Sequence, residues 1–222
     1  MGKVAIAIDG PSGAGKSTIA KLLAKELGFI YVDTGAIYRT VGLYVFRKGL
    51  DPADEEQVVS ILPEVNIELT YKDGVQCMFL NGEDVSGAIR EHQISSYASK
   101  VSAHPPVRAF LLEKQRDYAK KFSVIMDGRD IGTVVLPDAE IKIFLTASSE
   151  DRANRRYLEL IEKGQKVDFE TVHRDIKERD FNDANRATAP LKAADDAIVV
   201  DTSGNTLEQS VELLRNIVKE RL

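Results

Sequence analysis

The sequence predicts an α/β fold, in which helices flank a parallel β-sheet core and a small antiparallel β insert interrupts it. A short apolar run at 4–8 precedes a glycine-rich turn, and apolar residues at helical spacing follow that turn up to Leu27. A second strand pattern at 29–32 completes a βαβ unit, which favours parallel pairing. From 65 to about 85, apolar and polar residues alternate between hairpin signals, which indicates antiparallel strands.

The glycine-rich turn reads GPSGAGKST from Gly10 to Thr18 and matches the phosphate-binding pattern GxxxxGK[ST]. In this pattern the backbone amides surround an anion, Lys16 reaches the terminal phosphates and the Ser17 hydroxyl meets Mg²⁺. A helix that starts directly after the loop adds unpaired N–H donors and the positive end of its dipole. The alternative is a flexible turn, which the complete motif between a strand and a helix disfavours. The predicted phosphate-binding residues are Gly10, Gly13, Gly15, Lys16, Ser17 and Thr18.

Composition places the chain among ordinary globular proteins. Its 222 residues are 43% hydrophobic and 29% charged, which suits one core with insertions and carries no signature of disorder. The net charge of −5 argues against broad binding to nucleic acid or membrane surfaces, so an anionic ligand requires locally clustered arginines and lysines. The single cysteine, Cys77, is expected in the core. No apolar stretch reaches about 18 residues, so a cytoplasmic location is expected.

The stretch after the second strand predicts a helix from Asp33 towards Lys48, with Thr34 as a cap-like residue. Tyr38 and Arg39 lie in its first turns and fit a ligand site, or simply a packed ring and a solvated charge. The insert follows, with its turns predicted at Asp73-Gly74 and Asn81-Gly82.

Two helices are predicted next, at 89–103 and after His104-Pro105-Pro106. An apolar stripe marks the second helix: Val107, Phe110, Leu111, Tyr118 and Phe122. Arg108 lies in its first turn, where a cation opposes the helix dipole, so either an acceptor-rich partner or a solvent-facing side chain is expected.

The third strand, at 123–126, ends in Asp127-Gly128-Arg129-Asp130, and the fourth is expected at 141–145. P-loop proteins place a carboxylate that helps to hold Mg²⁺ at such a strand end, which makes Asp127 the candidate. A simple Asp-Gly turn is the alternative.

The helix predicted at 148–164 carries Arg152, Arg155 and Arg156 at i, i+3 and i+4. Clustered cations repel, and phosphate oxygens would offset that repulsion, although nearby acids also allow a solvated face. A mixed run of acids and bases from 174 to 186 follows on the next helix, and the chain closes with a strand at 197–200 and a helix at 206–221. The three histidines show no metal-ligand spacing.

A P-loop followed by many arginines indicates phosphoryl transfer, because neutralising the transferred group is the main task of such a protein. A GTPase would carry an NKxD motif, which the sequence lacks, and the chain is shorter than most motor ATPases. These features favour a P-loop kinase of a small molecule.

A set of short motifs runs along the chain: DGPSGAGKST at 9–18, DTGAIYR at 33–39, NGEDVSGAIR at 81–90, DGRDIGTVV at 127–135, SSEDR at 148–152, IKERD at 176–180, Asn185-Arg186 and Ala189-Pro190-Leu191. With these motifs the sequence closely resembles the bacterial cytidylate kinases over nearly its whole length. The first alone indicates nucleotide binding, and the set in this order is specific.

This resemblance implies transfer of the ATP γ-phosphoryl group to CMP or dCMP, with Mg²⁺ bridging the donor phosphates. It assigns Ser99, Arg108 and Asp130 to the base, and Arg179 and Asp183 to the sugar. It assigns Arg39, Arg129 and Arg186 to the acceptor phosphate, with Tyr38 and Thr34 at the same site. The residues expected to stabilise the transition state are Lys16, Arg152, Arg155 and Arg156, and the metal ligands expected are Ser17 and, through water, Asp127.

The resemblance also implies a core of 1–35, 98–148 and 180–222, a monophosphate-binding insert at 36–97 and a lid at 149–179. We expect a monomer, with the loop 201–204 near adenine. The rival functions are a P-loop kinase for UMP, AMP or a non-nucleotide acceptor, and a P-loop binding protein without transfer.

Overall fold

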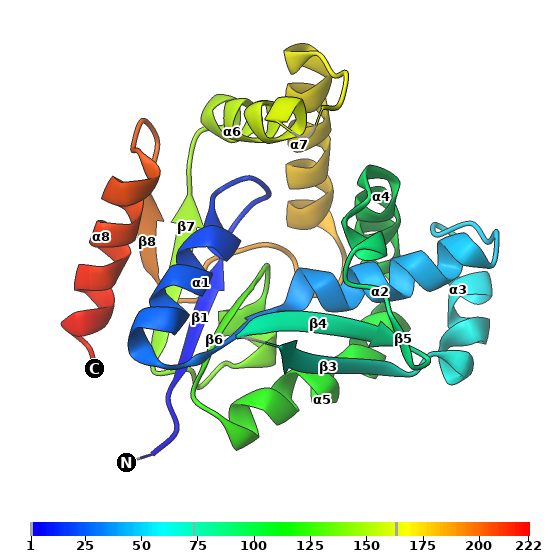
Figure 1. Ribbon diagram of the computed structural model, residues 1–222, viewed down its shortest axis with the longest axis horizontal. Coiled ribbons are helices and arrows are strands. Elements are labelled where there is room, and N and C mark those ends of the chain that lie inside the picture. The colour runs from blue at the N-terminus through cyan, green and yellow to red at the C-terminus, as the bar shows by residue number, and fades with distance from the viewer. Residues whose placement is uncertain (1, 73, 163) are drawn as a thin grey trace. The chain divides into compact units, whose positions relative to one another are not determined.

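A computed structural model describes residues 2–72, 74–162 and 164–222 (Figure 1). It divides into two compact units, of which the first comprises Met1–Tyr31 and Ser123–Leu222 and the second comprises Val32–Phe122. The second unit is wider at both ends than the insert predicted at 36–97, and the division into core, insert and lid stays a prediction. Among the described residues, no helix combines the length and the apolar character needed to cross a membrane.

The first unit is built on the predicted parallel sheet, whose strand order is β2-β6-β1-β7-β8. Strand β1 pairs in parallel with both β6 and β7, and β7 pairs in parallel with β8. The strands are β1 (Ala5–Asp9), β2 (Ile30–Asp33), β6 (Val124–Gly128), β7 (Ile141–Thr146) and β8 (Ile198–Asp201). The carboxyl end of β1 therefore lies beside the carboxyl ends of β6 and β7, which is where parallel α/β sheets bind their ligands.

Helices α1 and α8 pack on this sheet and bury its apolar side chains (Figure 1). Isoleucines and leucines of the central strands meet one apolar stripe of each helix, as the 3.6-residue period predicts. The helices of the unit are α1 (Lys16–Leu27), η3 (Ile131–Val135), α6 (Ser149–Glu162), α7 (Phe169–Asn185) and α8 (Leu207–Lys219). The single π-helical turn η3 was not predicted from the sequence.

The second unit carries the predicted antiparallel insert, a three-stranded sheet of order β3-β4-β5. Its strands are β3 (Ile67–Lys72), β4 (Val75–Leu80) and β5 (Glu83–Asp84). Its helices are α2 (Thr34–Arg47), α3 (Glu55–Ile61), η1 (Leu62–Glu64), η2 (Ala88–Arg90), α4 (His92–Val101) and α5 (Pro105–Lys121). Gly74 has the positive φ that suits the predicted turn, while Asp73 lies outside the described residues.

Three local predictions in this unit were wrong. The cap of α2 is Asp33, whose side chain accepts a hydrogen bond from the Ala36 backbone, and Thr34 is the first helical residue. Cys77 is half-buried, because it faces the less covered side of β4. Phe122 lies just beyond α5 and is exposed, so it does not continue the apolar stripe.

Candidate active site

The loop between β1 and α1 requires glycine at two positions. A Cβ atom on Gly10 would overlap the carbonyl oxygen of Leu145 in β7, and the Gly10 φ of 149° also disfavours other residues. A Cβ atom on Gly13, whose φ is 77°, would lie 3.0 Å from the carbonyl oxygen of Arg152. The loop backbone therefore packs directly on β7 and on the start of α6.

The first turn of α1 is open for an anion. Gly15 occupies the N-cap position, and no side chain caps the helix. Without a capping oxygen, the first N–H groups keep their capacity for a bound oxyanion, and the helix dipole adds to their attraction. This arrangement supports the prediction that the loop binds phosphate.

Lys16 is buried beside this turn, with 5% of its surface exposed, and its Nζ donates a hydrogen bond to the Pro11 carbonyl oxygen at 2.7 Å. Burial, followed by the charge of Arg129, lowers the Lys16 pKa to about 7, although the Asp127 and Asp9 carboxylates act in the opposite direction. In the absence of a bound anion, the ammonium form of Lys16 is therefore poorly stabilised.

Ser17 and Asp127, the two predicted metal ligands, contact each other. The Ser17 hydroxyl donates to Asp127 Oδ2 at 2.7 Å, and the Tyr31 hydroxyl donates to Asp127 Oδ1 at 2.8 Å. Within the described chain, no group of three or more His, Cys, Asp or Glu side chains is arranged for a metal. One carboxylate and one hydroxyl still suit Mg²⁺, because this ion keeps waters and takes substrate phosphate oxygens as further ligands.

Predicted acceptor residues of the first unit form one buried ionic cluster. Arg129 donates to Asp183 Oδ2 at 2.8 Å, and Arg186 donates to Asp130 Oδ1 at 3.4 Å and lies 4.0 Å from Asp183. Burial alone would raise the Asp183 pKa, but the charge and hydrogen bond of Arg129, with the charges of Arg186 and Arg179, lower it overall. The structure therefore brings together all five predicted acceptor residues of this unit.

Arg152 differs from the other two arginines predicted on α6, because its guanidinium is buried and held on several sides. Its Nη1 and Nη2 donate to the two carboxylate oxygens of Asp180 at 3.0 and 2.6 Å. Its Nε donates to the Ala147 carbonyl at 2.9 Å, and Nη1 also donates to the Ser12 carbonyl at 3.0 Å. Arg152 therefore joins α6, α7 and the phosphate-binding loop.

Arg155 and Arg156 find other partners. Arg155 donates to the Thr202 carbonyl at 2.9 Å, within the loop predicted near adenine, whereas Arg156 pairs with Glu159 at 2.7 Å. Only Arg156 fits the alternative of a solvated face. The three arginines share one helix, but each has its own partner, which relieves the repulsion expected from their spacing.

In the second unit, the start of α2 holds an arginine close to a carboxylate. Asp33 Oδ1 caps the helix, and Asp33 Oδ2 accepts a hydrogen bond from Arg39 Nη2 at 2.8 Å. Thr34 is buried beside them, and the buried Nε of Arg39 has no hydrogen-bond partner among the described residues. An orphaned guanidinium donor of this kind suits an anionic ligand.

The same unit places Arg108 over Tyr38, with 5.4 Å between the guanidinium carbon and the ring centroid. Arg108 is only 7% exposed and donates to the Ser102 carbonyl at 3.1 Å, so the solvent-facing alternative was wrong. Ser99 lies on α4, one turn before Ser102. The Ser99 carbonyl oxygen accepts a hydrogen bond from the Ser102 hydroxyl. The structure therefore groups Tyr38 with Arg108 and keeps Ser99 on the adjoining helix.

Three residues that contact the predicted site residues were given no role in the sequence analysis. Asp9, at the end of β1, accepts hydrogen bonds from the two backbone amides after Asp130. Tyr31 holds Asp127, and Asp180 holds Arg152. The sequence shows an acid, Asp9, directly before the phosphate-binding loop, which could have marked it as a site residue. Its hydrogen-bond partners could not be predicted, because they lie more than 100 residues further along the chain.

Comparisons with known proteins point to a single family. A family model described as cytidylate kinase matches residues 6–220. The chain is 51% identical to the cytidylate kinase of Caldicellulosiruptor bescii over 226 residues, which covers 100% of both chains. It is 50% identical to the cytidylate kinase of Thermosipho melanesiensis, over 97% of each chain, and 47% identical to that of Bacillus cereus strain G9842, over 97% of this chain and 96% of the relative.

A solved structure of an uncharacterized protein from Eubacterium ventriosum is similar in fold. It covers 99% of this chain and 100% of its own, with a TM-score of 0.55 and 14% identity. At that identity the similarity concerns the fold alone.

Proposed function

We propose that this chain, which belongs to the cytidylate kinase family, transfers the γ-phosphoryl group of ATP to CMP or dCMP and so forms CDP or dCDP. The observation that carries this function is the family match over residues 6–220, because that range contains every predicted site residue. The open first turn of α1 and the buried Lys16 beside it support binding of an anionic phosphoryl donor such as ATP.

We propose that the phosphate-binding loop holds the ATP phosphates and that Lys16 neutralises the charge of the γ-phosphoryl group during transfer. The oxygen donors of Ser17 and Asp127 fit Mg²⁺, which neutralises donor-phosphate charge when it is bound. Asp127→Asn should raise the Mg²⁺ concentration for half-maximal activity about tenfold, because the negative charge that holds the ion through water is lost. Tyr31→Phe is the matched control, since it keeps the carboxylate, and an unchanged Mg²⁺ requirement in Asp127→Asn would remove Asp127 from the metal site.

On the acceptor side, we propose that arginines bind the CMP phosphate and that polar residues read its base and sugar. The phosphate residues are Arg39, Arg129 and Arg186; the base residues are Ser99, Arg108 and Asp130; the sugar residues are Arg179 and Asp183; Thr34 and Tyr38 complete the site. The attacking phosphate oxygen of CMP is already anionic, so the transfer requires no general base.

The carboxylate of Asp130 explains why this site would prefer cytosine to uracil. Cytosine carries an exocyclic amine that donates to a carboxylate, whereas uracil presents a carbonyl oxygen there. A buried acceptor that faces another acceptor loses roughly 1–3 kcal/mol, which corresponds to a preference for CMP over UMP of about five- to 160-fold. Asp130 is 5% exposed, so water does not readily relieve such a mismatch.

We propose that Arg155 and Arg156, with Arg152, belong to a lid that neutralises the transferred group and excludes water. Arg152 already joins α6, α7 and the loop, so its present contacts hold the lid helices on the phosphate-binding loop. Excluding water favours transfer to CMP over hydrolysis of ATP. We further propose that the enzyme acts in the cytoplasm as a monomer.

A coupled assay of ADP release tests the function, with CMP, dCMP, UMP and AMP at equal concentrations. We expect CMP and dCMP to be the preferred acceptors. Absence of acceptor-dependent turnover would leave a binding protein without transfer, and preference for UMP or AMP would refute the cytidine assignment.

Asp130→Ala should lower the CMP-to-UMP ratio of kcat/KM about tenfold while leaving ATP binding nearly unchanged. Asp138→Ala, which removes an exposed acid eight residues later, is the matched control and should keep the ratio. Equal losses for CMP and UMP in Asp130→Ala would show that Asp130 does not read the base.

A further inference from the structure

Asp9 connects the carboxyl ends of two neighbouring strands. It is the last residue of β1, directly before the phosphate-binding loop, and its side chain reaches across to the chain that leaves β6. Asp9 Oδ1 accepts a hydrogen bond from the Ile131 amide at 2.8 Å, and Oδ2 accepts one from the Gly132 amide at 2.7 Å. Its two oxygens therefore hold the two amides that immediately follow Asp130.

These bonds fix the backbone on the carboxyl side of Asp130. The Asp130 carbonyl in turn accepts hydrogen bonds from the amides of Val134 and Val135, at 2.9 and 3.2 Å, which closes the short helix η3. Ile131 is 1% exposed, so its amide finds no replacement partner in water if the carboxylate is removed. The backbone at Asp130 thus depends on a side chain of the neighbouring strand.

We propose that Asp9 is a positioning residue for the acceptor base, because its carboxylate fixes the backbone beside Asp130 and so sustains the preference for CMP over UMP. This inference rests on the proposed base-reading role of Asp130. A hydrogen-bonding carboxylate must be held closely in position to discriminate between an amine and a carbonyl, so a small shift of the Asp130 backbone weakens discrimination.

The charges around Asp9 support a role beyond local packing. Burial raises the Asp9 pKa to about 6, the two amides and the Lys16 charge act against that rise, and the Asp130 charge adds to it. A neutral residue would avoid the desolvation cost, but only a carboxylate offers an acceptor oxygen to each of two adjacent amides. The contact with both amides therefore favours an acid at this position.

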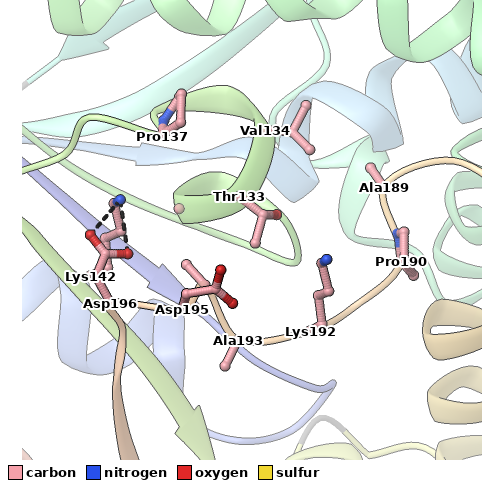
Figure 2. A pocket seen from close by; sticks show the side chains of 12 residues that line it. Thr133, Val134, Pro137, Lys142, Ala189, Pro190, Lys192, Ala193, Asp195 and Asp196 are labelled. Carbon is pink, nitrogen blue, oxygen red and sulfur yellow. Dashed lines mark hydrogen bonds and ion pairs between the residues drawn. The ribbon is translucent and has the colours of Figure 1, made fainter.

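Gly132 offers a control at the same contact. A Cβ atom there would lie 3.5 Å from Asp9 Oδ2, an ordinary van der Waals distance, and 3.2 Å from the flexible Lys142 side chain, so Gly132→Ala adds a methyl group beside the carboxylate and keeps both hydrogen bonds. Figure 2 shows Lys142 paired with Asp196 beside η3, at a pocket of roughly 450 Å³. Asp196→Asn is the matched control, because it removes a carboxylate near η3 that does not contact the Ile131 or Gly132 amides.

The experiment compares Asp9→Ala, Asp9→Asn, Gly132→Ala and Asp196→Asn in the full-length protein. For each variant, kcat/KM is measured with CMP and with UMP, ATP affinity is measured without an acceptor, and folding is checked by urea titration. We expect Asp9→Ala to lower the CMP-to-UMP ratio at least fivefold and to change ATP affinity less than threefold. Asp9→Asn, which keeps one acceptor oxygen, should have an intermediate effect, and Gly132→Ala and Asp196→Asn should keep the wild-type ratio.

Three results would overturn the proposal: equal losses for CMP and UMP in Asp9→Ala, an unchanged ratio in both Asp9 variants, or weaker ATP binding at an unchanged ratio. A wild-type enzyme without CMP preference would instead refute the proposed function, independently of the variants. If the variants do not fold, amide hydrogen exchange in the wild-type protein decides. CMP should protect the Ile131 and Gly132 amides more than UMP does, and equal protection would contradict the role of Asp9.

Discussion

The pKa of Lys16 makes ATP affinity depend on pH in a predictable direction. In the free protein, burial and the Arg129 charge lower this pKa to about 7, so the side chain loses its proton as pH rises through neutrality. Bound phosphates favour the ammonium form and raise the pKa again. ATP binding above pH 7 should therefore take up a proton at Lys16, and affinity should fall as pH rises.

The size of the effect follows from the fraction of protein in which Lys16 is protonated. With a free-state pKa of about 7, that fraction is about one half at pH 7 and about one eleventh at pH 8. The apparent Kd for ATP should therefore rise about twofold by pH 7 and about elevenfold by pH 8, relative to acidic conditions. Each further unit of pH should weaken binding about tenfold until the pKa of the complex is reached.

Isothermal titration calorimetry measures this linkage directly. Titrations at pH 8 in buffers with different ionisation enthalpies should show uptake of about 0.9 proton per ATP bound. The phosphate groups of ATP are fully ionised at this pH, since their last pKa lies near 6, so they contribute little to the uptake.

Lys16→Arg is the matched control because a guanidinium keeps its proton throughout this range. It should bind ATP with no proton uptake and with a flat pH dependence between pH 7 and 9. Uptake below about 0.2 proton in the wild-type protein at pH 8, with ATP still bound, would refute a Lys16 pKa near 7.

Two further predictions concern stability and are measured as the free energy of unfolding in urea. Gly10→Ala should destabilise the protein by about 3 kcal/mol, because the new methyl group overlaps the β7 backbone. The control is Gly2→Ala, whose new methyl group has no atom within 4 Å and should change stability by less than about 0.5 kcal/mol. Arg129→Met should lower the free energy of unfolding by about 2 kcal/mol or more, because Asp183 loses the partner that keeps its buried carboxylate ionised. The control is Arg47→Met at an exposed ion pair, which should lower it by less than about 1 kcal/mol. A neutral Gly10→Ala, or an Arg129→Met no worse than Arg47→Met, would contradict these assignments.

The elements that the sequence predicted well depend on short-range patterns. The strand, glycine-rich loop and helix at the N-terminus follow from hydrophobic period and turn chemistry, and the structure confirms them within a residue or two. The antiparallel insert was predicted for the same reason, because its strands are joined by tight turns. The cap of α2 was misplaced by one residue, since Asp33 and Thr34 are both good capping residues and only the backbone distinguishes them.

The environment of individual charges was harder to predict. The sequence left open whether Arg108 faces solvent or an acceptor-rich partner, and in the structure Arg108 is buried over Tyr38. The arginines of α6 were expected to act as one group, yet Arg152 is bound to Asp180, which lies 28 positions further along the chain. Burial depends on elements that are distant in sequence, and hydrophobic periodicity carries no information about them.

Residue types at short and recognisable spacings were enough to predict the family, the phosphate-binding loop and the set of arginines and acids from which an acceptor site can be built. The strand order, the pairing of Arg129 with Asp183 and the contact of Asp9 with the amides after Asp130 became visible only in the folded chain. These two side-chain contacts join residues that are 54 to 123 positions apart. Parallel strands meet through long crossovers, so packing of the whole chain, rather than any local pattern, selects which of their ends lie side by side.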